Sequence, residues 1–361
     1  MQRSIYIRPV GLFPAPMDEG DKAWGGLPLT GQPLRFAAVE IIERDGKTTI
    51  RRIVALGEAF ERDWGRHTLA ASDLLEAIRA PRTRLAGLAL DRPRIMGIVN
   101  VTPDSFSDGG MLGSAQDAID YGLRLAEEGA DILDIGGEST RPGADPVSLE
   151  EELARVMPVI EGLRVRTETR MSIDTRKAEV MRCAAAAGVD IINDVSALIH
   201  DPQSLAVAAE TGLPVILMHA QGDPKTMNED PQYRDVVLDV FDFLEKRIAA
   251  CEAAGIPKSK LVADPGIGFG KHLHHNVAVM SALSLYHGLG VPVLLGASRK
   301  KLIDSICDVP NPKDRIPGSL AAVLAGAAQG VQIVRVHDVA ATRQALAVWQ
   351  AALSGTDKIL G

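Results

Sequence analysis

The chain contains little cysteine, and this scarcity excludes two kinds of small-domain architecture. Cys183, Cys251 and Cys307 are the only cysteines in 361 residues, and no Cys-x-x-Cys pair occurs. Neither a disulfide framework nor a zinc site of the usual spacing is therefore expected. This usage of cysteine is typical of a reducing compartment.

Long apolar runs and an excess of basic charge are also missing. No segment approaches membrane-spanning length, and residues 1–6 lack the apolar core of a signal peptide, so we expect a cytoplasmic protein with no membrane partner. The formal net charge is −8 and the isoelectric point lies near 5.6. Nucleic acid is therefore not an expected partner, although a local basic cleft for an anionic small molecule is compatible with this balance.

From residue 94 onward, short apolar or β-branched runs alternate with longer amphipathic segments. This alternation is typical of parallel strands joined by helices, and a repeat of about 34 residues is close to that of an eight-unit barrel. We therefore predict an α/β fold, a (βα)8 TIM barrel. Its predicted strands are 95–99, 132–135, 170–173, 190–192, 214–218, 261–263, 291–295 and 331–336; its predicted helices are 115–128, 149–164, 177–187, 202–210, 235–254, 277–287, 318–329 and 340–353.

The first 91 residues do not follow the βα pattern. Segments 35–42 and 48–55 flank an Asp45-Gly46 step that is typical of a hairpin, and segment 69–78 has the pattern of a helix. No motif that carries chemistry occurs in this part. We predict that residues 1–91 form a small N-terminal α+β extension, a cap with a β-hairpin and a helix, and that residues 92–361 form the barrel.

Polar residues stand at the carboxyl ends of the predicted strands, which meet at one mouth in a parallel barrel. Two carboxylates and an amide among them follow apolar runs, where a buried polar group without a partner costs several kcal/mol. Such a set suits the N–H-rich edge of a flat heterocycle such as an aminopyrimidinone. Each residue taken alone could equally be a helix N-cap or a turn residue. The strand-end residues are Asn100, Asp134, Asp174, Asn193, His219, Asp264, Ser298 and Arg335.

Basic groups follow the last two predicted strands. Arg335 and His337 are two apart on an extended segment and therefore point the same way, and with Asn100 on the neighbouring strand they could hold a phosphate. Lys300 follows the seventh strand, whereas Lys301 fits a solvent-facing position on a helix better. The sequence thus predicts an anion site at the barrel mouth.

Three further segments need an interpretation. Residues 100–110 and 136–143 are polar and contain glycine, so we expect loops that close over a ligand. Segment 266–271 matches neither the dinucleotide nor the Walker spacing, since His272 stands where Ser or Thr is required. Its glycines instead let Phe269 approach a flat ligand. Three histidines, His272, His274 and His275, match no common metal-ligand spacing.

These motifs together resemble the dihydropteroate synthase family of folate biosynthesis, whose members are pterin-binding TIM barrels. The resemblance covers residues 94–354, and Ile267 stands where the family often has Phe. The extension of about 90 residues is absent from the shorter members. The most specific motifs are Asn-Val-Thr-Pro-Asp-Ser-Phe-Ser-Asp-Gly-Gly at 100–110 and Gly-Gly-Glu-Ser-Thr-Arg-Pro-Gly at 136–143; the others lie at 172–175, 192–194, 217–222, 264–271, 298–300 and 335–338.

The resemblance implies a transferase that joins 4-aminobenzoate to 6-hydroxymethyl-7,8-dihydropterin diphosphate, giving 7,8-dihydropteroate and diphosphate. C–O cleavage to a pterin cation followed by amine attack is the expected order, because diphosphate leaves a CH2 group on an electron-rich ring. The family also implies a homodimer, inhibition by sulfonamides and Mg2+ as cofactor.

The resemblance also assigns roles to residues, all of them expectations at this point. The catalytic residues are Asp174, Asp264, Lys300 and Asp108. The pterin contacts are Asp174, Asn193, Asp264 and Lys300 at its edge and Arg335 on its face, and the further substrate contacts are Met218, Phe269, Gly296 and Val336. The diphosphate contacts are Arg335, His337 and Asn100, with Mg2+ on Asn100; the 4-aminobenzoate contacts are Phe106, Thr140, Arg141, Pro142 and Ser298.

Two other functions remain open. A pterin-dependent methyltransferase barrel would share the pterin pocket but has no use for the anion site at Arg335 and His337. A non-catalytic pterin-binding homologue would keep the pocket and lack turnover, and an assay of dihydropteroate formation would separate it from the synthase.

Overall fold

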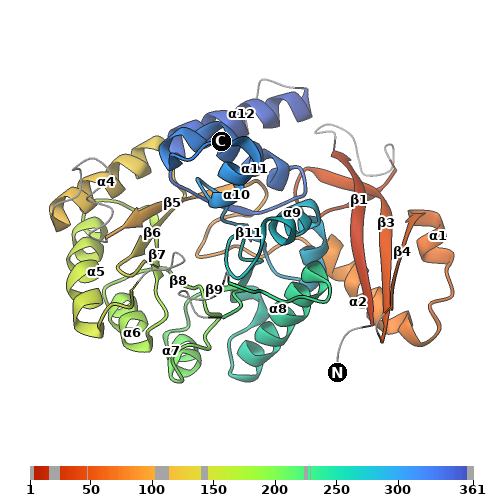
Figure 1. The fold of residues 1–361 in the computed structure, drawn as a ribbon, viewed down its shortest axis with the longest axis horizontal. Coiled ribbons are helices and arrows are strands. Elements are labelled where there is room, and N and C mark those ends of the chain that lie inside the picture. The colour runs from red at the N-terminus through yellow and green to blue at the C-terminus, as the bar shows by residue number, and fades with distance from the viewer. Residues whose placement is uncertain are drawn as a thin grey trace.

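The computed structural model describes residues 4–15, 25–46, 48–101, 114–139, 145–222, 227 and 229–355. Within these residues, eight parallel strands form a barrel with helices around its outside (Figure 1). The strands pair in the order β10-β9-β8-β7-β6-β5-β12-β11, and a bridge between Ala263 and Val293 joins the two ends of that order. The (βα)8 barrel predicted from the sequence is confirmed.

All eight predicted strands are present. Their bounds are β5 Arg94–Asn100, β6 Ile132–Gly136, β7 Arg170–Asp174, β8 Ile191–Asp194, β9 Val215–Met218, β10 Leu261–Asp264, β11 Leu294–Leu295 and β12 Ile333–Val336. The helices of the barrel are α4 Ala115–Glu128, α5 Leu149–Arg164, α6 Ala178–Ala186, α7 Ser204–Thr211, α8 Val236–Ala253, α9 Leu273–Ser281, α10 Lys301–Cys307, α11 Ile316–Ala327 and α12 Val339–Ser354, with 3-10 turns η2 Lys258–Lys260, η3 Leu283–Leu289 and η4 Pro312–Arg315.

The prediction of a helix over 277–287 is wrong. Helix α9 begins four residues earlier and ends at Ser281, and the 3-10 helix η3 follows. Six of the seven residues of η3 are buried. A segment buried on all sides has no alternation of apolar and polar residues, and its type of helix therefore cannot be predicted from the period of its sequence. Helix α10 is an additional short helix, and in the described part of the chain no helix is long and apolar enough to span a membrane.

The N-terminal extension is a small antiparallel sheet beside the barrel (Figure 1). Strands β3 Leu34–Asp45 and β4 Thr48–Ala55 form the predicted hairpin. Strand β1 Ile5–Pro14 was not predicted, because Pro9 and Gly11 interrupt its pattern, and it pairs along the other edge of β3. The remaining elements are β2 Leu27–Pro28, α1 Leu56–Glu61, η1 Gly65–His67 and α2 Thr68–Arg79.

The lower part of the barrel lumen has its own small core. Seven strand residues pack there with Leu85 and Leu90 from the segment that leads into β5, and this cluster is separate from the core between strands and helices. Side chains alternate along a strand, so the residues two positions further along face the same lumen. The seven are Met96, Ile132, Ile191, Ile216, Val262, Leu294 and Ile333.

Candidate functional site

The upper lumen of the barrel carries the polar side chains. Side chains alternate along each strand, so the residue two positions after each member of the apolar layer also faces the lumen. These residues are Asp134 of β6, Asn193 of β8, Met218 of β9, Asp264 of β10 and Arg335 of β12. Four of these five are at most 6% exposed. Five distant segments of the sequence therefore meet at one place, the carboxyl end of the barrel.

Arg335 links two of the carboxylates. Its Nε donates to Oδ2 of Asp134 at 2.5 Å, and its Nη2 donates to Oδ2 of Asp174 at 2.7 Å. Burial opposes the charge of this guanidinium, but the two carboxylates raise its pKa. Asp134 also accepts from the Ser172 hydroxyl and, at 3.3 Å, from Nδ2 of Asn193. Asp134 thus fixes the orientation of both Arg335 and Asn193.

Asp174, at the end of β7, has one oxygen available to a ligand. Its Oδ2 is held by Arg335, whereas Oδ1 is buried and has no hydrogen-bond partner among the described residues. Burial raises the pKa of this carboxyl to about 7, and Arg335 works against the shift. A buried acceptor without a partner costs free energy, and an N–H donor on a bound ligand would satisfy it.

Asp264 and Lys300 form the other wall of the lumen. Oδ1 of Asp264 accepts from the backbone N–H of Gly266 at 2.7 Å, and burial raises the pKa of the carboxyl while Lys300 lowers it. Lys300 donates to the carbonyl of Ile267, and its Nζ lies 4.6 Å from the ring centroid of Phe269. Burial lowers the pKa of Lys300 to about 8, and Asp264 opposes this shift.

The loop after β10 is held in place by a buried lysine and an asparagine. Nζ of Lys271 donates to the carbonyls of Gly266 at 2.8 Å and Phe269 at 3.1 Å, and it lies 2.8 Å from Nδ1 of His219. Asn276 in α9 accepts from the backbone N–H of Gly268 at 2.7 Å. A Cβ on Gly266 would stand 1.9 Å from the carbonyl oxygen of His219, so only glycine fits there.

Residues after β11 and β12 meet beside this loop. The Ser298 hydroxyl lies 3.1 Å from Nδ1 of His337 and accepts from its backbone N–H at 3.2 Å. A Cβ on Gly296 would lie 3.8 Å from Cβ of Arg335 and 3.9 Å from Nζ of Lys300. The absence of a side chain at Gly296 therefore leaves room next to both cations.

A second cluster of buried charge lies at the base of segment 136–143. Lys177 donates to Glu138 at 3.0 Å and to Glu152 at 2.5 Å, and Arg176 donates to Glu138 at 2.8 Å. Although burial works against its charge, these two cations lower the pKa of Glu138. The start of this segment is thereby anchored to the end of β7.

A cavity of about 200 Å3 lies beside this mouth. Phe269 contributes to its wall, but none of the lumen carboxylates does. It is therefore distinct from the space between Asp174 and Asp264. Its lining residues include Arg176, Ser196, His200, Met227, Phe243 and Phe269.

The structure brings most of the sequence-predicted residues together. Asp174, Asn193, Asp264, Lys300 and Arg335 share the lumen, with Met218 in the same inward row and Phe269, Gly296, Ser298 and His337 around them. The prediction that the Val336 side chain contacts the substrate is wrong, because side chains alternate along β12 and that of Val336 packs in the core between strands and helices. Phe106, Asp108, Thr140, Arg141 and Pro142 lie outside the described residues.

Two positions of the candidate site were underestimated from the sequence. Asp134 was recognised as a strand-end residue but was given no role, although it contacts both Arg335 and Asn193. The available signal was an acidic residue inside an apolar strand, which requires a buried partner. Lys271 was treated only as part of a glycine-rich motif, and its contacts with the loop carbonyls were not foreseen.

No group of three or more His, Cys, Asp or Glu side chains suited to a metal occurs among the described residues, and this includes the three histidines of α9. Asn100 ends β5 half-buried, and its amide has no hydrogen-bond partner in the described part of the chain. One amide oxygen suits Mg2+ when phosphate and water supply the other ligands.

Comparisons with known proteins agree with this geometry. Residues 96–337 match the family model described as pterin binding enzyme. The dihydropteroate synthase of Escherichia coli is 50% identical over 270 residues, which cover 75% of this chain and 95% of the relative. The chain belongs to the dihydropteroate synthase family of pterin-binding enzymes.

Relatives and solved structures give the same family. The dihydropteroate synthase of Neisseria meningitidis serogroup B is 52% identical over 271 residues, 73% of this chain and 94% of the relative. The Xanthomonas albilineans dihydropteroate synthase, solved with 4-aminobenzoic acid, has a TM-score of 0.71 and 54% identity over 75% of this chain and 98% of its own. That of Yersinia pestis, solved with a sulfonamide drug, has a TM-score of 0.71 and 48% identity over 73% and 96% of the two chains.

The family membership confirms that the chain is an enzyme of the transferase class. The matched region coincides with the barrel, because the model match runs from β5 to the residue after β12. The synthase relatives favour this class over the pterin-dependent methyltransferase considered from the sequence.

Proposed function

We propose that this dihydropteroate synthase family member joins 4-aminobenzoate to 6-hydroxymethyl-7,8-dihydropterin diphosphate and that the lumen residues carry the reaction. One observation supports the assignment above the others. The buried Oδ1 of Asp174 has no partner among the described residues, while Oδ2 is fixed by Arg335. An N–H on the edge of a flat heterocycle is the group that this acceptor lacks.

In this proposal the pterin lies in the lumen between Asp174 of β7 and Asp264 of β10. The carboxylates of Asp174 and Asp264 accept hydrogen bonds from N–H groups at its edge, the amide of Asn193 contacts the same edge, and Lys300 donates to a ring acceptor. The guanidinium of Arg335 is a planar cation suited to stack on the ring. Met218 and Gly296 line the remaining space, and the absent side chain at Gly296 leaves room beside the two cations. Only the backbone of Val336 could contact the ring, because its side chain belongs to the core outside the lumen.

The diphosphate is assigned to the mouth of the barrel near β5 and β12. Arg335 and His337 would contact its oxygens, with Asn100 beside them on the paired strand. We propose Mg2+ as the cofactor, held by the amide oxygen of Asn100. The ion would neutralise charge on the leaving diphosphate.

Charge in the lumen favours departure of diphosphate before the amine attacks. Loss of diphosphate leaves a CH2 cation conjugated with the pterin ring, and the carboxylates of Asp174 and Asp264 stabilise this positive charge. Arg335 and His337 stabilise the departing oxygens. An arylamine needs no strong base to attack such a cation, which is consistent with a site in which we assign no general base.

4-Aminobenzoate is assigned to the outer part of the mouth. Ser298 and Phe269 lie there in the described structure, and Phe106, Thr140, Arg141, Pro142 and Asp108 belong to the segments that would close over it. Sulfonamides would compete at this place, since they have the shape of 4-aminobenzoate. The Xanthomonas protein was solved with 4-aminobenzoic acid and the Yersinia protein with a sulfonamide drug, which supports both compounds as ligands of this chain.

We further propose the organisation of the whole protein. Residues 1–91 form the extension and residues 92–361 the catalytic barrel, and the protein acts as a homodimer in the cytoplasm. Size-exclusion chromatography with light scattering would test the dimer, because a monomer at working concentration would contradict it.

The decisive experiment is a direct assay. The purified protein is incubated with the pterin diphosphate, Mg2+ and 4-aminobenzoate, and 7,8-dihydropteroate and diphosphate are measured. Equal amounts of both products are expected, with loss of turnover in an Asp264→Asn variant. Binding of the pterin without product formation would identify the chain as a non-catalytic homologue.

A further inference from the structure

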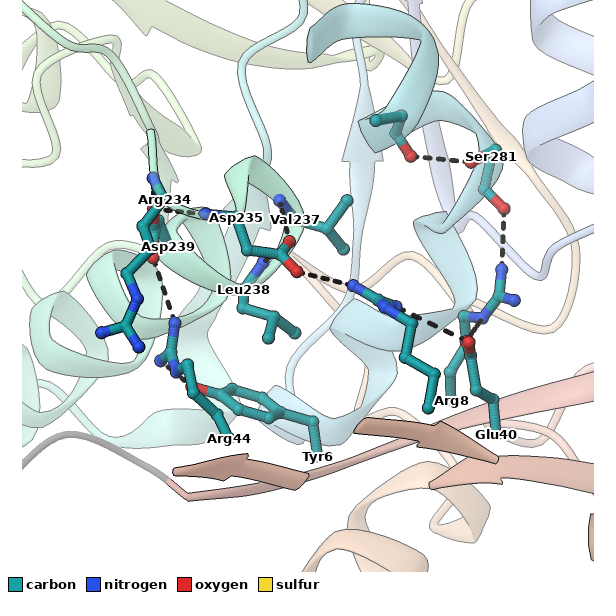
Figure 2. A network of polar contacts seen from close by, with 12 residues as sticks. Tyr6, Arg8, Glu40, Arg44, Arg234, Asp235, Val237, Leu238, Asp239 and Ser281 are labelled. Atoms are coloured by element: carbon teal, nitrogen blue, oxygen red, sulfur yellow. Dashed lines mark hydrogen bonds and ion pairs between the residues drawn. The ribbon is translucent and has the colours of Figure 1, made fainter. Parts of the chain in front are cut away.

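The N-terminal sheet contacts the barrel through a network of ion pairs and hydrogen bonds (Figure 2). Arg44, near the end of β3, donates to Oδ1 of Asp239 at 3.1 Å and to Asp242, both in α8. The hydroxyl of Tyr6 in β1 donates to Asp242 at 2.7 Å. The Arg44 side chain is only 2% exposed and that of Asp242 is 8% exposed, so this ion pair is largely removed from water, whereas Asp239 keeps some access to it.

A second arginine of the sheet contacts the first turn of α8. Nη2 of Arg51 donates to Oδ2 of Asp235 at 2.7 Å. The other oxygen of Asp235 accepts from the backbone N–H groups of Val237 at 3.2 Å and Leu238 at 3.3 Å. Arg51 therefore contacts the residue that caps α8.

These contacts continue into the segment that precedes α8. Oδ2 of Asp239 accepts from the backbone N–H groups of Arg234 at 2.8 Å and Asp235 at 3.1 Å. The next residue toward the mouth is Tyr233, whose hydroxyl donates to the carbonyl of Gly270 at 2.7 Å. Gly270 lies between Phe269 and Lys271 in the loop after β10.

The sheet also contacts the far end of α9. Arg8 in β1 donates from Nη1 to the carbonyl of Ser281, the last residue of that helix, at 3.0 Å. Nε of Arg8 also donates to Oε2 of Glu40 in β3 at 2.6 Å, which orients the arginine. Near the other end of α9, Asn276 accepts from Gly268 of the same loop. The extension thus contacts α9, which bonds segment 264–271 directly, and the start of α8, which follows Tyr233.

We propose that the N-terminal sheet is a positioning element of the active site, which acts through Arg44 and Arg51 on the start of α8 and from there on the loop that carries Asp264 and Phe269. This inference rests on the proposed function. A buried ion pair adds little stability compared with apolar packing of similar volume, but it fixes the geometry of its partners. The network is therefore better suited to fixing the position of the start of α8 than to stabilising the attachment of the sheet to the barrel.

Substitution of the arginines tests this proposal. In Arg44→Met, we expect the KM for the pterin diphosphate to rise about fivefold while kcat stays within about twofold, measured well below the unfolding midpoint. Arg51→Met, at a side chain that is 38% exposed, should change KM in the same direction without endangering folding. Arg44→Lys should restore part of the affinity, because it keeps the positive charge.

The matched control lies in the extension at the end of α1, and no ion pair joins it to the barrel among the described residues. Arg62 bonds Glu43 at 3.0 Å within the extension, and Arg62→Met should leave both KM and kcat unchanged. A purely structural role of the network would lower the unfolding midpoint of Arg44→Met and leave KM unchanged, and that outcome would overturn the proposal.

Hydrogen exchange separates this inference from the proposed function. In the ligand-free protein, Arg44→Met and Arg51→Met should speed exchange of the amides at 233–235 and 266–271, whereas Arg62→Met should not. Absence of synthase turnover in the wild type would refute the proposed function. Unchanged exchange in both variants would refute the positioning role, whether or not the wild type turns over.

Discussion

At the scale of single residues, the site depends on charges that are expensive to bury. Asp134, Asp174 and Arg335 lie together in the lumen, with Asp134 fully buried. The sequence indicated Asp174, because an acidic residue ended an apolar run. It could not indicate which carboxylate Arg335 contacts, since 161 and 201 residues separate the partners and only the barrel closure brings them together.

Asp174→Asn tests the charge of the carboxylate without changing its shape. We expect kcat to fall about 100-fold, because the amide cannot stabilise the pterin cation. The inhibition constant of inorganic diphosphate should change less than about threefold, since Asp174 is not assigned to the leaving group. Asp120→Asn, at a side chain that is 64% exposed on α4, is the matched control. Equal losses in turnover and diphosphate affinity would contradict the assigned role.

The pH dependence of kcat/KM for the pterin diphosphate follows from the two shifted groups. Burial raises the pKa of Asp174 to about 7 and lowers that of Lys300 to about 8. The rate should therefore fall as the carboxylate gains a proton below pH 7 and as the ammonium loses one above pH 8. Burial also raises the pKa of Asp264, so Asp174→Asn should leave only the part of the acidic limb that belongs to Asp264 and should keep the alkaline limb. A flat profile in the wild type would be inconsistent with these roles.

At the scale of elements, strands and amphipathic helices were predictable where one face is buried. The eight barrel strands were found because their apolar runs end in polar residues. Strand β1 was missed because Pro9 and Gly11 interrupt it, and only its pairing with β3 makes it a strand. The 3-10 helix η3 was mistaken for the end of a longer helix, because the extension and the barrel bury it from both sides.

The loop after β10 offers a test of backbone geometry. Gly266 has a φ of +68°, and a Cβ there would stand 1.9 Å from the carbonyl oxygen of His219. We expect Gly266→Ala to lower the free energy of unfolding by more than about 3 kcal/mol and to weaken pterin binding, because the loop must move. Denaturant unfolding and pterin titration would measure both effects.

Gly255→Ala is the matched control for this substitution. Gly255 has a φ of +93°, and nothing lies within 4 Å of its Cβ position. The substitution should therefore lower the free energy of unfolding only by the backbone strain of about 1 kcal/mol. Similar losses in both variants would show that the close approach to His219 has no special importance.

At the scale of the whole molecule, the extension and the barrel share one hydrophobic core. Tyr6 and Phe36 of the sheet belong to the same buried cluster as Phe241 of α8 and Tyr286 of η3. The rings of Tyr6 and Phe241 lie 5.4 Å apart, and those of Phe241 and Tyr286 lie 6.4 Å apart. Composition alone could not reveal this continuity, since residues 1–91 have no motif that points to α8.

Deletion of residues 1–91 would therefore uncover apolar surface on the barrel. Phe241 and Tyr286 are both fully buried in the full chain, and exposing each side chain costs about 2 kcal/mol. A contiguous apolar patch of this kind favours association between molecules. We expect the 92–361 fragment to be less stable than the full chain and to aggregate, as measured by thermal unfolding and light scattering. A monodisperse fragment with full turnover would contradict this expectation. The barrel would then need neither the shared core for stability nor the sheet for activity, and the extension would be a dispensable cap.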